Sequence, residues 1–289
     1  MKHILAAIDL GRDTEKIIAY ALWLAKDPAG TSAEIDLLYV LDYGFTPPAY
    51  LSPYMEKEKE MDEVEIKKWE GLISPFGIQV SHRIAAGRLF ETFSSSLKEL
   101  GPDVMVLGHT SHLVRPSTSE RLIRSLETSM LVVRGAKTEG VAPGALDIKK
   151  IVCAVDFSDN SKKAFEFAKA LADRSSAALV AVHVVSNLKM EKGFRKWEDM
   201  DEDDKNSYRN DLISRAETEM RSLSNERKGL ECIVRAGITY KTINEIAVEN
   251  NADLIVVGAR GLSYIESIIL GSVTEAIVKS SPCPVMIVR

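Results

Sequence analysis

The fold of this chain is decided by residues 253–274, which read DLIVVGARGLSYIESIILGSVT. Four apolar residues, Leu254 to Val257, lead into Gly258 and Gly261, and Gly271 then opens a stretch with amphipathic periodicity. This order predicts a strand, a loop bounded by glycines and the start of a helix.

The glycines and the helix start together favour an anion site. Glycine accepts positive φ and lets backbone N–H groups approach a ligand, so glycines at both ends of the loop can direct several donors at one point. A helix beginning near Ser272 adds unpaired N–H groups and a positive dipole end, with the hydroxyls of Ser272 and Thr274 beside them. We expect phosphate there, and glycines that only serve turns are the alternative.

Other phosphate loops do not fit this chain. It has no G-x4-G-K-[S/T] and no G-x-G-x-x-G after its first strands. The spacing G-x2-G-x9-G-[S/T], carried by Gly258, Gly261, Gly271 and Ser272, instead resembles the signature of the nucleotide-binding universal stress proteins. The resemblance covers nearly the whole chain as two tandem copies, strongly in the second half and partially in the first.

Length and composition restrict the class of protein. The chain has 289 residues, enough for two domains, and its net charge of −5 argues against nucleic acid and anionic membrane as partners. Cys153, Cys232 and Cys283 are widely spaced among apolar neighbours, so we expect core thiols rather than disulfides or a metal site. Without an apolar run long enough for a signal peptide or a membrane span, a soluble, cytoplasmic protein is expected.

An internal repeat divides the chain. KHILAAID at Lys2–Asp9 matches KKIVCAVD at Lys149–Asp156. The repeat predicts two similar domains, 1–137 and 149–289, joined by an exposed linker at 138–148. Three further pairs of segments match, namely Ala86-Gly87 with Ala236-Gly237, Asp103–Gly108 with Asp253–Gly258, and Leu131–Arg134 with Met286–Arg289.

Apolar runs alternate with helical periodicity in each half, which is typical of βαβ units and a parallel sheet. The predicted fold class is α/β, with two tandem doubly wound, Rossmann-like domains, each a five-stranded, mainly parallel sheet with about four helices. Strands of the second half are expected at Ile151–Val155, Ala178–Val185, Cys232–Val234, Leu254–Val257 and Val285–Val288. Helices are expected from a Ser158 cap to about Arg174, and at Tyr208–Leu223, Tyr240–Asn250 and Val273–Lys279.

Asp156 directly follows the first apolar run of the second half. Ligands of doubly wound sheets lie at the carboxyl ends of strands, where a carboxylate can accept both ribose hydroxyls. Capping the next helix is the alternative role, for which Ser158 is better spaced. The family resemblance further implies that Ala154 and Val155 line an adenine pocket and that backbone atoms of Val184 pair with the adenine edge.

The resemblance also assigns the remaining contacts. Gly258 would contact ribose, and the phosphates would be surrounded by Gly261, Gly271, Ser272, Val273 and Thr274. Arg260 could hold a phosphate in bidentate fashion or be a solvated loop residue. His183 is expected to be structural. The implied cofactor is ATP, or AMP or ADP, with Mg²⁺ or Mn²⁺ carried by the phosphates and no metal site in the protein itself.

The first half departs from the pattern. Asp9 and Gly108 match the second half, but Ser111 and Pro116 stand where the loop needs glycine, and Ser119 aligns with Thr274 across a shorter loop. Proline has no N–H and a fixed φ. We therefore predict weak or no ATP binding in the first half.

Three other segments allow two interpretations each. His109 and His112 could seed a metal site but are expected to be solvent-exposed. Tyr43–Tyr54 is rich in proline and could be a lid or, as we favour, a packed connecting loop. The acidic run Glu198–Asp204 is expected to be solvated or mobile.

We expect a nucleotide-responsive stress or regulatory protein with an unidentified protein partner. An ATPase or phosphotransferase is the first alternative, although only Glu266 and Glu275 lie near the phosphate motif. A scaffold or carrier of a small ligand in the altered first-half pocket is the second. The short terminal strands Leu131–Val133 and Val285–Val288 suggest an internal pseudo-dimer of the two domains and a possible homodimer.

Overall fold

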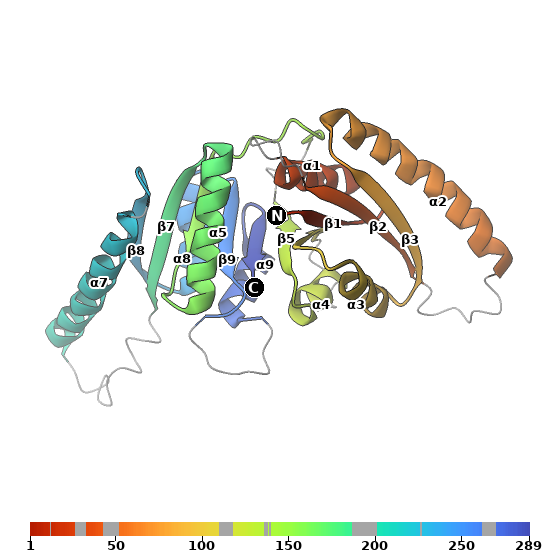
Figure 1. Cartoon of the computed structure of the whole chain (residues 1–289). Coiled ribbons are helices and arrows are strands. Elements are labelled where there is room, and N and C mark those ends of the chain that lie inside the picture. Colours follow the sequence, from red (N-terminus) through yellow and green to blue (C-terminus); the bar gives the residue numbers. More distant parts are fainter. Residues whose placement is uncertain are drawn as a thin grey trace. The chain divides into compact units, whose positions relative to one another are not determined.

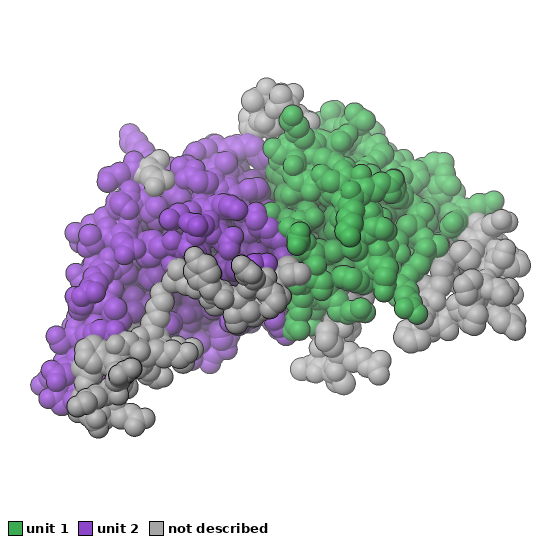
Figure 2. All heavy atoms as spheres, turned by 60° about the horizontal axis from the view of Figure 1, so that its bottom comes forward, with its two compact units in different colours: residues 1–147 green, residues 148–289 purple. Residues whose placement is uncertain are grey.

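The structure is a computed structural model that describes residues 1–11, 13–26, 33–42, 52–109, 118–135, 138, 140–186, 201–225, 227–261 and 270–289, with only the backbone at 52–58, 118 and 224. The chain divides into two compact units, Met1–Asp147 and Ile148–Arg289 (Figure 2). Thr138 and Ile148 are each 1% exposed, so two residues of the predicted linker are anchored in protein rather than exposed.

The first unit is one parallel sheet with helices packed on it (Figure 1). Its strands follow the order β3-β2-β1-β4-β5. They are β1 (His3–Ile8), β2 (Glu34–Asp42), β3 (Val80–Gly87), β4 (Val104–Gly108) and β5 (Ser129–Val133). The helices among the described residues are α1 (Thr14–Ala25), α2 (Ser52–Ile73), the short 3-10 helix η2 (Ser74–Phe76), α3 (Leu89–Leu100) and α4 (Thr118–Ser125).

The second unit repeats this arrangement. Its strands are parallel and follow the order β8-β7-β6-β9-β10. They are β6 (Lys150–Ala154), β7 (Ala178–Ser186), β8 (Glu231–Gly237), β9 (Leu254–Gly258) and β10 (Val285–Val288). The described helices are α5 (Asp159–Ser175), α7 (Glu202–Ser224), α8 (Thr239–Glu249) and α9 (Ser272–Ser280). The predicted tandem α/β fold is therefore confirmed.

The apolar runs become strands because both faces of each sheet are covered. Neighbouring residues of a strand point to opposite faces, yet Ile4 and Leu5 of β1 are both 0% exposed, as are Ile255 and Val256 of β9. Continuous rather than alternating hydrophobicity is what a parallel sheet between helices requires.

The described part of the acidic run forms the start of a helix. Asp201 caps α7, accepting a hydrogen bond at Oδ1 from the N–H of Asp204 at 2.8 Å, and residues 202–204 form the first helical turn. Acidic side chains are favourable there because they oppose the positive end of the helix dipole. Residues 201–204 are exposed, as expected of a solvated segment, but they are ordered in a helix start, and residues 198–200 lie outside the described part.

Strand β8 (Glu231–Gly237) is longer than the predicted strand, Cys232–Val234. Its extension includes Arg235, whose guanidinium forms two hydrogen bonds with the carboxylate of Glu249 on α8, at 2.9 and 2.8 Å. This contact lowers the pKa of Glu249. A charged residue is tolerated because β8 stands at one end of its unit's strand order, and Arg83 and Glu99 form the corresponding pair in the first unit.

Helix α2 begins at Ser52, within the proline-rich segment Tyr43–Tyr54. Residues 43–51 lie outside the described part, so both interpretations of that segment, lid and packed loop, stay predictions. No helix in the described part of the chain is long and apolar enough to cross a membrane.

Candidate functional site

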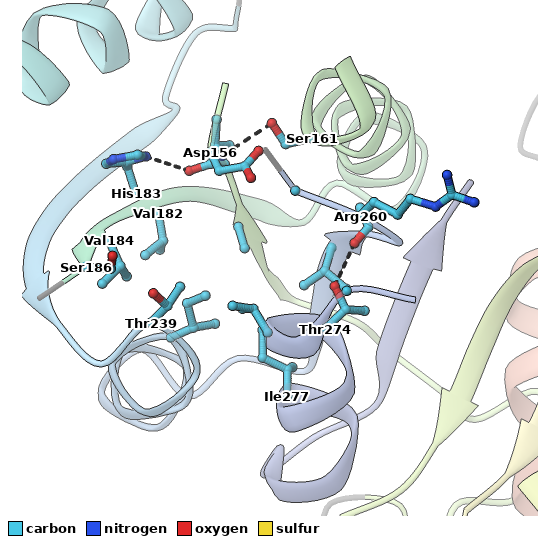
Figure 3. A pocket seen from close by; sticks show the side chains of 18 of the residues that line it. Asp156, Ser161, Val182, His183, Val184, Ser186, Thr239, Arg260, Thr274 and Ile277 are labelled. Carbon is cyan, nitrogen blue, oxygen red and sulfur yellow. Dashed lines mark hydrogen bonds between the residues drawn. The ribbon is translucent and has the colours of Figure 1, made fainter. Parts of the chain in front are cut away.

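A cavity of about 290 Å³ lies where β6, β7 and β9 end in the second unit (Figure 3). The carboxyl ends of parallel strands meet at one edge of a sheet, and the beginnings of α8 and α9 complete the wall. All eleven predicted site residues line this one cavity: Ala154, Val155, Asp156, Val184, Gly258, Arg260, Gly261, Gly271, Ser272, Val273 and Thr274. Their roles toward a ligand stay predictions.

The carboxylate of Asp156 is held from one side by Ser158. Its Oδ1 atom accepts hydrogen bonds from the backbone N–H and the hydroxyl of Ser158, at 3.1 and 2.5 Å. The same hydroxyl oxygen accepts the N–H of Ser161 at 3.2 Å and so caps α5, as predicted. One serine thus fixes both the start of α5 and the orientation of the carboxylate.

The loop glycines matter through the missing Cβ atom and not through positive φ. Gly258, Gly261 and Gly271 all lie outside the left-handed region. A Cβ on Gly258 would lie 2.9 Å from the carbonyl carbon and oxygen of Asn160, and a Cβ on Gly261 would collide with Oδ2 of Asp156. At Gly271 the nearest atom would be the carbonyl oxygen of Ala259 at 3.4 Å, an ordinary contact.

Helix α9 begins at the cavity without a side-chain cap from any described residue. Gly271 is the N-cap residue, with φ −72° and ψ 148°, and its N–H donates to the carbonyl of Ala259 at 2.8 Å. The hydroxyl of Thr274 donates to the carbonyl of Gly258 at 2.8 Å and ties the helix to the end of β9. An uncapped helix N-terminus suits an anion, because its first N–H groups lack intrahelical partners.

His183 has a structural contact, as expected. Its Nδ1 lies 2.8 Å from the carbonyl oxygen of Val155, and since a carbonyl only accepts, Nδ1 donates. The imidazole also packs against the ring of Phe157, with centroids 4.8 Å apart. The histidine therefore joins the end of β7 to the backbone that leads into Asp156.

Arg260 lines the cavity through part of its side chain only. In Figure 3 its guanidinium extends away from the wall formed by Val184 and Thr239. The role of Arg260 toward a phosphate stays a prediction.

Eight lining residues were not predicted to line the site: Ser161, Val182, His183, Ser186, Thr239, Ile243, Val257 and Ile277. Two spacing rules could have found some of them. Val182 and Ser186 lie two residues on either side of Val184 on β7, and alternate residues of a strand share a face. Thr239 and Ile243 are four apart on α8 and so share a helix face, although no motif marks that helix.

The first unit has its own cavity, of about 360 Å³, at the equivalent strand ends. Its described lining residues are Ala7, Ile8, Asp9, Asp13, Ile17, Tyr39, Val40, Leu89, Phe93, Leu107, Gly108, Ser119 and Leu122. The predicted loop positions Ser111, His112, Pro116 and Ser117 lie outside the described residues.

His109 is buried, with 7% exposure, so the expectation that it is solvent-exposed is wrong. Its N–H donates to the carbonyl of Val133 at 3.1 Å, and its Nδ1 lies 3.1 Å from the Ser119 hydroxyl oxygen. This backbone hydrogen bond extends the pairing of β4 with β5 by one residue. The sequence of the loop does not reveal this pairing.

Comparison with known proteins identifies relatives for both units. The model of the universal stress protein family matches residues 1–134 and 147–289. A universal stress protein of Methanocaldococcus jannaschii is 28% identical over 153 residues, which cover 49% of this chain and 94% of the relative. One of Thermus aquaticus is 31% identical over 141 residues, which cover 49% of this chain and 98% of the relative. The structure of a universal stress protein from Archaeoglobus fulgidus superposes with a TM-score of 0.71, and the match covers 99% of this chain and 98% of the Archaeoglobus chain. At 21% identity, that likeness concerns the fold alone.

Proposed function

The chain belongs to the universal stress protein family, and from this premise we propose that its second unit binds an adenine nucleotide, ATP, ADP or AMP, in the cavity around Asp156. Occupancy of that cavity then regulates a protein partner. The main support is the packing of Asp156 against Gly261, which brings a carboxylate suited to ribose hydroxyls together with the glycine loop suited to phosphates.

The chemistry of the wall agrees with this ligand. Val182, Val184 and Ile243 offer an apolar surface for a base, and the uncapped start of α9 offers N–H donors for phosphates. In the described part of the chain no three His, Cys, Asp or Glu residues are grouped to hold a metal ion. We propose that the divalent cation, Mg²⁺ or Mn²⁺, is carried by the phosphates of the nucleotide.

A regulatory role follows from ligand-dependent surfaces. Ser272 and Val273 line the cavity and are exposed, and Val273 is 38% accessible. A nucleotide bound there covers these residues and places phosphate charge at the surface, so a partner can distinguish the filled from the empty state. The strands β5 and β10 each stand at one end of their unit's strand order, and pairing of two chains through them is a further proposal, tested by light scattering.

No observation in the described residues favours an ATPase. Glu275 is paired with Lys279 at 2.8 Å on α9, and Glu266 lies outside the described part. A base that orients water needs to reach the reacting phosphate. ATP hydrolysis by the wild type that both Asp156→Ala and Gly271→Pro abolish would nevertheless establish that the protein is an ATPase.

Calorimetric titration of ATP and Mg²⁺ into ligand-free protein tests nucleotide binding. The φ of Gly271 is compatible with proline, so Gly271→Pro chiefly removes the N–H that donates to Ala259, while Gly271→Ala retains it. We expect one site per chain, at least about tenfold weaker in Gly271→Pro and nearly unchanged in Gly271→Ala.

The location is tested by two matched variants, Asp156→Asn in the second unit and Asp9→Asn in the first. Binding should weaken only in Asp156→Asn. Absence of binding to folded, ligand-free wild type, or loss of binding in Asp9→Asn alone, would overturn the proposed function.

A further inference from the structure

The cavity of the first unit has the chemistry of a different ligand. We propose that it binds an organic cation, a small molecule in which an ammonium group is joined to an apolar or aromatic body. This site depends on residues of the first unit alone, and nucleotide binding in the second unit is not needed for it.

Its walls carry the rings of Tyr39 and Phe93, at positions where the second cavity has His183 and Ile243. The repeat and the strand registers place residues of the two cavities at equivalent positions. Three equivalent pairs differ in character: Tyr39 against His183, Leu89 against Thr239, and Phe93 against Ile243. The first cavity thus has a tyrosine and a leucine where the second has a histidine and a threonine.

Two carboxylates, Asp9 and Asp13, line this apolar cavity. Asp13 contacts Lys16, with Oδ1 2.7 Å from Nζ, so its charge is largely offset. Asp9 instead accepts hydrogen bonds at Oδ1 from the N–H of Gly11 and the hydroxyl of Thr14, both at 2.9 Å. These donors are neutral, and Asp9 makes no ion pair with any residue that the structure describes.

The orientation of Asp9 is fixed by local packing. A Cβ on Gly11 would lie 3.2 Å from Oδ2 of Asp9, so the turn lies close to the carboxylate, and Asp9 itself is exposed. The Thr14 side chain that donates to it is fully buried. A preorganised carboxylate loses little conformational entropy when a ligand binds.

The charged residues that line the first cavity favour a positively charged ligand. No Lys or Arg is among the described lining residues of the first cavity, whereas Arg260 lines the second. At the position of Asp13, whose charge is offset by Lys16, the second unit carries neutral Asn160, so the difference in charge comes from Asp9 and from the absence of a lining cation among the described residues. A phosphate in the first cavity would meet a carboxylate that no described residue neutralises by an ion pair, whereas an ammonium group would pair with it and also gain from the rings of Tyr39 and Phe93.

Three probes of similar shape and different charge test this assignment by calorimetry. They are tryptamine, a cation, tryptophol, its neutral alcohol analogue, and indole-3-propionate, an anion. We expect tryptamine to bind about tenfold more tightly than tryptophol, and indole-3-propionate to bind most weakly. Equal or tighter binding of the alcohol or the anion would overturn the proposal.

Matched variants place the site. Asp9→Asn keeps an oxygen acceptor for Gly11 and Thr14 and removes only the charge, so it should abolish the preference for tryptamine. Asp156→Asn changes the equivalent residue of the second unit and should leave that preference intact. If Asp156→Asn removes the preference and Asp9→Asn does not, the cation binds in the second unit and the proposal is wrong.

A second variant covers the case in which Asp9→Asn does not fold. Leu89→Thr copies Thr239 and should weaken tryptamine and tryptophol together, by several-fold, because it makes the wall polar. Unchanged binding of both probes in folded Leu89→Thr would contradict a site in this cavity. ATP titration of the same variants separates this result from the second unit, since neither Asp9→Asn nor Leu89→Thr touches that cavity.

Discussion

Oδ2 of Asp156 occupies the space that a Cβ atom on Gly261 would need. The carboxylate at the end of β6 and the glycine after β9 are 105 positions apart in sequence, and the absence of one side chain lets them touch. The glycine is therefore required by the carboxylate, whether or not it also contacts a phosphate.

Substitution of Gly261 by Ala should displace the Asp156 carboxylate. We expect Gly261→Ala to weaken ATP binding by about tenfold or more, measured by calorimetry. Gly271→Ala is the control, because its added Cβ makes only ordinary contacts, and its affinity should stay within about twofold of wild type. Equal affinities of the two variants would show that the position of Asp156 is not important for the nucleotide.

Removing the hydroxyl of Ser158 should have two separable effects. Ser158→Ala loses the cap of α5, which lowers the free energy of unfolding by about 1 kcal/mol. It also releases Oδ1 of Asp156, so ATP affinity should fall. Thermal unfolding and calorimetry measure these effects, and Ser158→Thr, which retains a hydroxyl, should restore most of both. Loss of stability with unchanged affinity would restrict Ser158 to the cap.

Asp103 should make folding depend on pH in the acidic range. Its Oδ2 accepts hydrogen bonds from the N–H groups of Lys2 and His3, at 2.6 and 3.2 Å, and chiefly the bond from Lys2 lowers its pKa below 3.8. A lowered pKa in the folded state stabilises the protein above pH 3.8, and this stabilisation disappears as the pH falls through the folded value. The contribution is at most about 1 kcal/mol because the carboxylate is exposed.

Urea unfolding of wild type and Asp103→Asn at several pH values measures this contribution. Wild type should be the more stable protein near pH 7, and the difference should shrink toward zero well below pH 3.8. A constant difference over the whole range would mean that the charge of Asp103 is irrelevant.

The three cysteines should differ in reactivity. Cys153 and Cys283 are 0% exposed, and burial raises the pKa of the Cys153 thiol far above its usual range. Cys232 on β8 is partly exposed, although burial and the charge of Glu231 raise its pKa as well. Since the thiolate is the reactive form, a thiol reagent should label Cys232 slowly in the native protein and all three cysteines after unfolding.

Mass spectrometry of the labelled protein identifies the sites. Cys232→Ser should abolish labelling under native conditions. Rapid native labelling of Cys153 would instead reveal local opening of β6.

The central strands and the grouping of the site could be predicted from sequence. Continuous apolar runs identify strands such as β9 because both faces of a parallel sheet are buried. The motif residues from Gly258 to Thr274 could be grouped with Asp156 because the ends of parallel strands meet at one edge of the sheet.

Features that depend on packing could not be predicted in this way. Thr239 reaches the cavity from α8, which carries no motif, and His109 is buried by pairing with Val133, far along the chain. The sequence analysis expected Gly261 to supply positive φ and a close approach of N–H groups to a ligand, whereas its φ is not in the left-handed region and the structure shows a steric need for glycine beside Asp156. Spacing alone does not distinguish these two uses of glycine.

The difference between Asp13 and Asn160 at equivalent positions has an evolutionary consequence. In an assembly of identical subunits every substitution appears in all sites at once, so a change that spoils nucleotide binding in one spoils it in all. Covalent duplication removes this constraint, because each copy in the chain can mutate separately. With the two ligands proposed above, one polypeptide would carry two different binding sites at a fixed one-to-one ratio.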